Sequence, residues 1–261
     1  MTIRADYHVH LRRSPCTAKE MTAEATLQAA SDIGLQEVGL INHLHPVTEL
    51  AIFREGREEL GVANGSRPET VLYGAEIDLL DQEGSTSYRE EVREHVDFLT
   101  LAPGHQQLEW VHSDLTLPPA EFLIRETQSI IKALSRERFD ILVHPYIYVA
   151  FPKLAPHYVG PLRPGDLPAS LVEELAAILV ENGTACEYHC RDIVVRPQSL
   201  GGESFVKSYM TLLDALRAQG VRFVTGSDAH RLDQIPRSRA APDWARNSLK
   251  RTAVNEQEGA S

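Results

Sequence analysis

Two histidines separated by a single residue stand near the start of the chain, in the stretch ADYHVH that covers residues 5–10. In an extended strand alternate side chains share a face, so we expect His8 and His10 to point the same way. Two neutral imidazoles on one face supply half of a metal site. An isolated pair of this kind is more often an ordinary strand end, so its meaning depends on the rest of the chain.

Further residues able to bind a metal stand at the ends of the apolar runs that follow. They are His43, Glu76, His105, His144, Glu187 with His189, and Asp228 with His230. The motif GSDAH repeats the spacing of DYHVH, because it places Asp228 and His230 two residues apart on one face. Since every run ends in such a residue, we expect these side chains to converge on one site.

This set of residues indicates hydrolytic metal chemistry. Histidine nitrogens and carboxylate oxygens with few thiolates suit Zn, Mn or Fe, and more than four ligands imply more than one ion. We therefore expect two or three divalent metal ions as cofactors. Ions about 3.5–4 Å apart can hold a hydroxide nucleophile and offset the charge on a phosphoryl group.

The apolar runs alternate with helical patterns. We predict strands within residues 5–10, 35–43, 70–80, 96–105, 139–145, 184–190 and 221–230, and helices within 17–34, 50–60, 119–137, 169–183 and 203–220. The first helix would begin with a capping box of Thr17 and Glu20 and end at Gly34. Such alternation builds a parallel sheet, either doubly wound or closed. A barrel of about seven strands brings all the carboxyl ends to one mouth, so we favour the barrel.

Composition limits the class of protein. A chain of 261 residues with a net charge of -11 fits one acidic globular domain, and we expect no nucleic-acid partner, because such binding rests on Lys and Arg. No apolar run is long enough for a membrane span, and the first residues lack the apolar core of a signal peptide. Three cysteines without a CxxC pair favour a reducing compartment, so we expect a cytoplasmic location.

The motifs DYHVH, INHLHP, GAEIDLL, APGHQQ, ILVHPY and GSDAH, taken in this order, resemble those of the PHP (polymerase and histidinol phosphatase) family. The resemblance is to its histidinol-phosphatase-like members and runs from about residue 3 to residue 236. It implies a single PHP domain over 1–236, folded as a distorted (β/α)7 TIM-like barrel. Residues 237–261 have little apolar periodicity, and we expect a loosely attached or disordered tail.

The resemblance also implies a ligand set. One ion would be held by His8, His10, Glu76 and Asp228, and Glu76 would bridge to a second ion. The second ion would take His105 and His144, and a third would take His43, His230 and a residue on the loop after β-strand residues 5–10. The resemblance further implies that Glu76, Asp228 and His230 act directly in catalysis.

Two positions depart from the family pattern. Cys16 stands where the family usually offers a histidine to the third ion; a thiolate can bind Zn or Fe, so Cys16 either substitutes as a ligand or leaves that ion weakly held. Asn42 replaces the aspartate that commonly precedes His43, which removes a charge from that position.

A phosphate substrate also needs cationic recognition, for which the planar arginine fork is suited. Arg196 is similar to the arginine that related phosphatases use, and Arg191 and His189 are further candidates for substrate contacts. An amine-bearing substrate such as histidinol phosphate would need a carboxylate as well. Glu187, Asp192 and Asp78 are open alternatives for that role.

We therefore expect a metal-dependent phosphatase that hydrolyses a small phosphomonoester, with histidinol phosphate as the leading candidate, through a hydroxide that bridges the metals. The expected partner is a small phosphorylated substrate and not a membrane, and the oligomeric state is left open. Two alternatives stay open. One is an amidohydrolase-type C–N or C–O hydrolase, and the other is a non-catalytic metal-binding PHP module.

Overall fold

The computed structural model describes residues 4–65, 69–114, 116–147, 162–191, 193 and 202–249. The strands of this part form one parallel sheet in the order β1 to β7. They are β1 (Ala5–His10), β2 (Glu37–Leu44), β3 (Thr70–Asp78), β4 (Phe98–Ala102), β5 (Ile141–Leu142), β6 (Ala185–His189) and β7 (Phe223–Gly226). This confirms the α/β fold with seven parallel strands.

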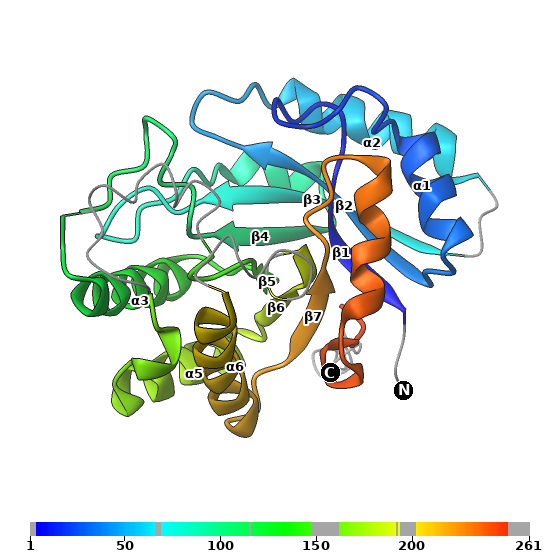
Figure 1. Cartoon of the computed structure of the whole chain (residues 1–261). Helices are drawn as coiled ribbons and strands as arrows, with labels where there is room; N and C mark the ends of the chain where they lie inside the picture. Colours follow the sequence, from blue (N-terminus) through cyan, green and yellow to red (C-terminus); the bar gives the residue numbers. More distant parts are fainter. Residues whose placement is uncertain are drawn as a thin grey trace, which may run out of the picture.

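Helices surround the sheet (Figure 1). They are α1 (Ala23–Asp32), α2 (Ala51–Asn64), α3 (Pro119–Arg136), α5 (Ala169–Asn182) and α6 (Gly202–Ala218), with the short 3₁₀ helices η1 (Glu90–Glu94), η3 (Pro164–Asp166), η6 (Leu232–Ala240) and η7 (Asp243–Ala245). No helix in the described ranges combines the length and the apolar character that crossing a membrane requires.

The sheet curves until its two outer strands meet, which gives a nearly closed (β/α)7 barrel. The residues just after β7 pair with β1: the amide of His10 donates to the carbonyl of Ala229 over 2.9 Å, and the amide of Ala229 donates to the carbonyl of His8 over 3.3 Å. The carboxyl ends of β1 and β7 therefore lie side by side. The motifs DYHVH and GSDAH meet at that point although they stand at opposite ends of the chain.

The inside of the barrel changes from apolar to polar along the strands. Its lower layer consists of inward-facing residues of several strands: Ala5, Tyr7, Ile41, Phe98, Ile141, Ala185 and Val224. Towards the carboxyl ends the inward positions are His43, Glu76, Thr100 and Glu187, all buried. The outward-facing residues of the same strands pack against the helices. The two-residue period of the strands therefore builds an apolar floor beneath a polar mouth.

The bounds of the first helix differ from the prediction. Helix α1 begins at Ala23, and its N-cap is Thr22, whose side chain accepts a hydrogen bond from the amide of Ala25 over 3.2 Å. The predicted capping box of Thr17 and Glu20 is wrong, because these residues lie in the loop that connects β1 to α1. Threonine at position 22 provides the same cap chemistry five residues later.

The folded part of the chain extends past residue 236, the boundary that the sequence suggested. Residues 237–249 include the end of η6 and all of η7 and pack on the barrel. Trp244 meets Phe223 and Tyr188 edge to face, at centroid distances of 5.1 and 5.4 Å, and Leu249 joins the apolar floor. Residues 250–261 lie outside the described residues.

Candidate metal centre

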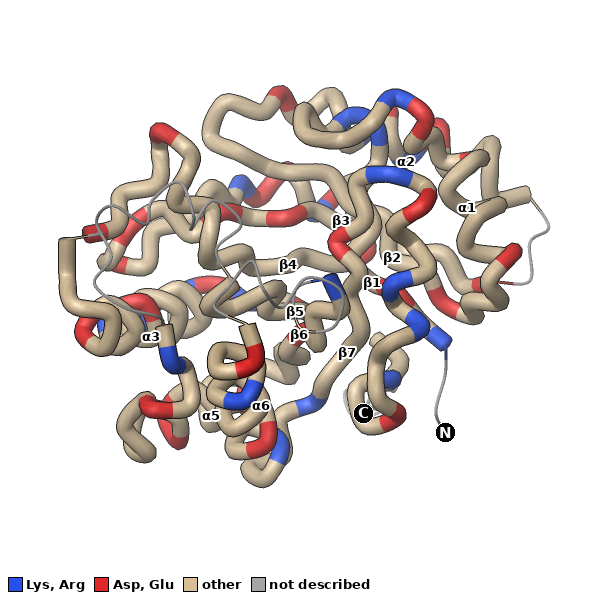
Figure 2. Tube along the Cα trace, in the orientation of Figure 1, with Lys and Arg blue, Asp and Glu red and all other residues tan. Residues whose placement is uncertain are grey.

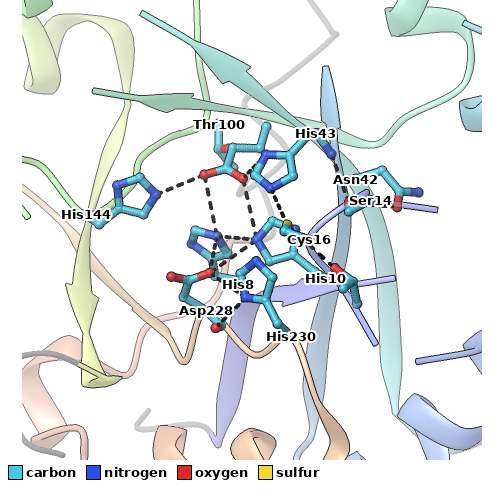
Figure 3. Close-up of polar contacts among 12 residues, drawn as sticks. His8, His10, Ser14, Cys16, Asn42, His43, Thr100, His144, Asp228 and His230 are labelled. Atoms are coloured by element: carbon cyan, nitrogen blue, oxygen red, sulfur yellow. Dashed lines mark hydrogen bonds and ion pairs between the residues drawn. The ribbon is translucent and has the colours of Figure 1, made fainter. Parts of the chain in front are cut away.

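The metal-binding residues found in the sequence gather at the carboxyl end of the barrel (Figure 3). His8 and His10 belong to β1, His43 to β2 and Glu76 to β3. The loops that follow β4, β5 and β7 supply the others, which are His105, His144, Asp228 and His230. All of these residues except His230 are buried.

Glu76 lies at the middle of this cluster. His43 faces it across the β2–β3 ladder, with Nδ1 2.8 Å from Oε2, and His144 Nε2 lies 2.9 Å from Oε1. Nε2 atoms of three more histidines lie between 3.5 and 3.7 Å from the same carboxylate; these histidines are His8, His10 and His105. One fully buried carboxylate thus faces five imidazoles.

Among the described residues there are three overlapping groups whose ligand atoms all lie within 4.8 Å of one another. They are His8, His10 and Glu76; His43, Glu76 and His105; and His10, His43 and His230. The first group contains three of the four residues that the resemblance implies for one ion. In the second group His43 joins Glu76 and His105, whereas the resemblance implied His144 beside them.

The unsatisfied atoms of the cluster fit a cation. Glu76 Oε2 and His43 Nδ1 are buried and have no hydrogen-bond partner among the described residues, although only 2.8 Å separates them. A buried carboxylate oxygen without a partner is costly, and a divalent ion would satisfy it together with the imidazole lone pair. The mixed nitrogen and oxygen donor set suits Zn, Mn or Fe.

Asp228 completes the cluster on the β7 side. Its Oδ1 lies 3.2 Å from His10 Nε2, 3.3 Å from His230 Nδ1 and 3.5 Å from His8 Nε2, and its Oδ2 forms an ion pair with Arg191. Asp228 has a φ of 49° and His144 a φ of 32°. Positive φ is uncommon for residues with a Cβ, although Asp and His tolerate it better than most, and such backbone strain clusters at functional sites.

Cys16 lies at the rim of the cluster, with Sγ 3.2 Å from His43 Nε2. Burial of the thiol, followed by the charge of Glu76, raises the pKa of Cys16 to about 12. The loop that carries it is tied to α2, because Arg13 pairs with Glu55 and Glu59 over 2.6 and 3.3 Å. The sulfur is therefore held where it could join an ion bound to His43, once that ion displaces the thiol proton.

Glu187 does not belong to the three ligand groups, but it orients two histidines of the cluster. Its carboxylate accepts hydrogen bonds from His8 Nδ1 over 2.7 Å and from the His144 amide over 2.7 Å, and it lies 3.1 Å from His189 Nδ1. This leaves the Nε2 of His8 facing Glu76. Glycine at position 226 makes room for the carboxylate, because a Cβ there would lie 1.6 Å from Glu187 Oε1.

Asp78, the last residue of β3, also orients histidines of the site. Its two oxygens accept from His105 Nδ1 and His45 Nδ1, each over 2.7 Å, and from Trp110 Nε1 over 2.9 Å. Metal-binding histidines commonly donate their second nitrogen to a carboxylate, which fixes the tautomer. The sequence offered Asp78 and Glu187 as partners for a substrate amine, and Glu187 also as a strand-end residue able to bind a metal; the structure engages both with histidines instead. Each stands two residues from another inward-facing site residue on its strand, Glu76 or His189, and that spacing was the signal.

The charges in the cluster shift its pKa values strongly. Burial lowers the pKa of His8, but the carboxylates of Glu187, Glu76 and Asp228 outweigh it and raise the pKa to about 10. Burial raises the pKa of Glu76, yet the neighbouring histidines, with His43 first, hold it well below its usual range. Burial lowers the pKa of three other ligands, which are His10, His43 and His144. Burial also lowers the pKa of His105, but the hydrogen bond to Asp78 and the charge of Glu76 raise it to about 9. The metal-free cluster thus holds ionised carboxylates beside neutral His10, His43 and His144, whereas His8 and His105 carry protons that a bound ion would displace.

Asn42 does not face the cluster. Its side chain donates to the Tyr73 hydroxyl over 2.7 Å and accepts from the Ser14 hydroxyl over 3.1 Å. Ser14 in turn accepts from the His43 amide over 3.2 Å. Asn42 therefore joins the β1–α1 loop to β2 and β3, and a charge at this position is not needed for that role.

A cavity of about 360 Å³ opens onto the cluster. Its walls include Cys16, His45, Gln107, Leu108 and Arg191, together with the cluster residues other than His8 and His10. Of the residues expected to contact substrate, Arg191 lines the cavity, whereas His189 is fully buried between Glu187 and Asp228, with its Nε2 3.9 Å from Asp228 Oδ2. Arg196 and Asp192 lie outside the described residues.

No model of a known protein family matches the chain, and no curated protein matches it.

Proposed function

We propose that the protein is a metal-dependent phosphoesterase that hydrolyses a small phosphomonoester, with histidinol phosphate as the first candidate. The observation that carries the proposal is the convergence of five imidazoles on the buried carboxylate of Glu76 at the floor of an open cavity. Each pair of the three ligand groups has one residue in common, which is Glu76, His10 or His43, and this overlap supports more than one ion. Sites with two neighbouring divalent ions are common among phosphate-ester hydrolases.

The chain's own residues have separate parts in this proposal. His8, His10, Glu76 and Asp228 would hold one ion, His43 and His105 would join Glu76 at a second, and His230 with Cys16 would extend the site to a third. Divalent ions bound there would make water a stronger nucleophile at neutral pH and offset phosphoryl charge. Glu187 and Asp78 fix the orientation of His8 and His105.

Recognition of the substrate would depend on the cavity wall. Arg191 carries a positive charge to the wall, where its guanidinium is held by Asp228. A phosphate that enters the cavity would meet this guanidinium and the ligands of the ions together. Because Glu187 and Asp78 are engaged with histidines, a substrate amine would need another carboxylate. Phosphomonoesters without an amine therefore belong in the same test.

The test is phosphate release from a panel of phosphomonoesters by protein reconstituted with Mn or Zn. The panel contains histidinol phosphate, nucleoside monophosphates and sugar phosphates. Asp228→Asn removes a charge from the cluster, and Asp233→Asn, at a side chain that is 71% exposed on η6, is the matched control. We expect turnover by the wild type and the control and a loss of at least about a hundredfold in Asp228→Asn.

Two results would overturn the proposal. Hydrolysis of amides or carboxylic esters without phosphate release would favour the amidohydrolase alternative. Two or more bound ions without turnover of any substrate would favour a metal-binding module that lacks activity. Turnover of other phosphomonoesters but not of histidinol phosphate would support the reaction and reject that substrate.

A further inference from the structure

A second cavity, of about 340 Å³, lies at the opposite end of the barrel from the metal cluster. It is lined by Arg4, Arg239 and Arg246, together with Ala5, Ile33, Leu35 and Ser238. Arg4 and Ala5 stand at the amino end of β1, whereas His10 ends the same strand at the cluster. At about 3.3 Å per residue, the two sites are about 16 Å apart along β1.

The guanidinium groups of Arg4 and Arg239 converge on one short turn. Arg239 donates from Nη2 to the carbonyl of Ile33 over 3.3 Å. Arg4 lies against the next residue, because a Cβ added at Gly34 would be 3.3 Å from its Nη1. Two positive groups therefore meet the same two-residue turn after α1, and an anion between them would be attracted by both.

The third arginine extends this arrangement to η7. Arg246 donates from Nη2 to the carbonyl of Arg239 over 2.9 Å, and its Nη1 lies 3.5 Å from Asp243, an aspartate that is 81% exposed. Within the described part of the chain, Arg4 and Arg239 form no ion pair with any acidic side chain. Figure 2 shows basic positions gathered where the start of β1 lies beside the segment that follows β7.

The concentration of positive charge is unusual for this chain, whose net charge is -11. Each arginine offers a planar set of donors that matches the oxygens of a phosphate or carboxylate group. Ala5, Ile33 and Leu35 add apolar surface beside the arginines, against which the rest of a ligand could pack. A volume near 340 Å³ falls within the range of small-molecule sites.

We propose that this cavity, which we call the arginine cavity, binds a small dianionic metabolite through a phosphate or dicarboxylate group. The three guanidiniums hold the oxygens, and the apolar wall of Ile33 and Leu35 receives the rest of the ligand. The inference does not depend on the proposed phosphoesterase activity, because the site shares no residue with the metal cluster.

The test is calorimetric titration of the chelator-treated full chain with inorganic phosphate and, separately, with malonate. Treatment with a chelator prevents binding of either anion to metal ions. We expect saturable binding of at least one anion, weakened at least about tenfold in Arg4→Gln. The Arg4 side chain makes no hydrogen bond in the described chain, so this variant should fold. Arg231→Gln is the matched control, because Arg231 also lies near η6 and does not line the cavity.

The two anions distinguish the sources of the ligand. Tighter binding of phosphate indicates a phosphate ester, and tighter binding of malonate indicates a dicarboxylate. Absence of saturable binding, or an equal loss in Arg4→Gln and Arg231→Gln, would overturn the proposal, since an equal loss reflects net charge alone. Arg246→Gln is a second variant, and a melting curve of each variant verifies its fold.

Discussion

Glu76 Oε2 lies 2.8 Å from His43 Nδ1, and neither atom has a hydrogen-bond partner among the described residues. The two residues are direct neighbours across the β2–β3 ladder, so the backbone register sets their separation. An oxygen and a nitrogen held this close without a hydrogen bond are well placed to share a cation. The predictions below follow from this pair and from the residues around it.

Glu76→Gln should abolish binding of at least one ion, because Glu76 faces every histidine of two of the three ligand groups. Metal content after dialysis against Zn or Mn, measured by mass spectrometry, gives the number of ions per chain. Glu37→Gln is the matched control, since Glu37 is a buried strand glutamate at the other end of the barrel, bonded to Ser248 and Tyr7. Equal metal content in the two variants would contradict the account.

Glu187→Gln should weaken metal binding without removing a ligand. The charge that Glu187 places behind His8 would be lost, while a hydrogen bond from His8 Nδ1 to the amide oxygen is retained. Loss of such a partner typically lowers metal affinity by about 10- to 100-fold. Competition with a coloured chelator measures the affinity, and an unchanged value would show that Glu187 is not a supporting residue.

Asp78 couples the metal cluster to a fluorescent side chain, because it binds both His105 and Trp110. In a Trp244→Phe background, Trp110 is the remaining tryptophan of the two in the chain. Adding metal should then change the Trp110 emission, and Asp78→Asn should reduce that change. A metal-bound protein with unaltered emission would exclude this coupling.

Cys16 should react slowly with alkylating reagents although the residue is exposed. Its pKa is raised to about 12, so at pH 8.5 the thiolate population is roughly a thousandfold below that of a free cysteine. The alkylation rate of the metal-free protein should rise with pH well above 9. Mass spectrometry of iodoacetamide-treated protein gives the rate at each pH, and rapid alkylation of Cys16 at pH 8.5 would contradict this pKa.

Metal binding should also stabilise the fold, since it neutralises buried groups that are present only in the folded chain. Metal at about a thousand times its dissociation constant adds about 4 kcal/mol, which corresponds to a rise in Tm of about 8–16 °C for a domain of this size. Calorimetry with and without a chelator tests this. A Tm that does not change with metal would mean that the folded cluster is equally stable with protons in place of metal ions.

Much of this arrangement could be predicted from the sequence. The alternation of strands and helices predicted a parallel sheet, and the metal-binding residues at the end of every predicted strand, from His8 and His10 to Asp228 and His230, favoured the barrel and its mouth. Local patterns could not place the start of α1, because Thr17 and Thr22 offer the same cap chemistry. The two-residue spacing from Glu76 and His189 could place Asp78 and Glu187 on the inward face, but it could not identify the histidines that they contact, since the contacts with His45 and His8 join different strands and depend on the closed barrel.

The most direct test of the account is a titration of the metal-free protein with Mn or Zn that records bound metal and phosphate release together. We predict no release without metal and a rate that rises with the ions bound and levels off when the cluster is filled, at two or three equivalents per chain. Phosphate release by the chelated protein, or a filled cluster without release from any phosphomonoester of the panel, would contradict the account.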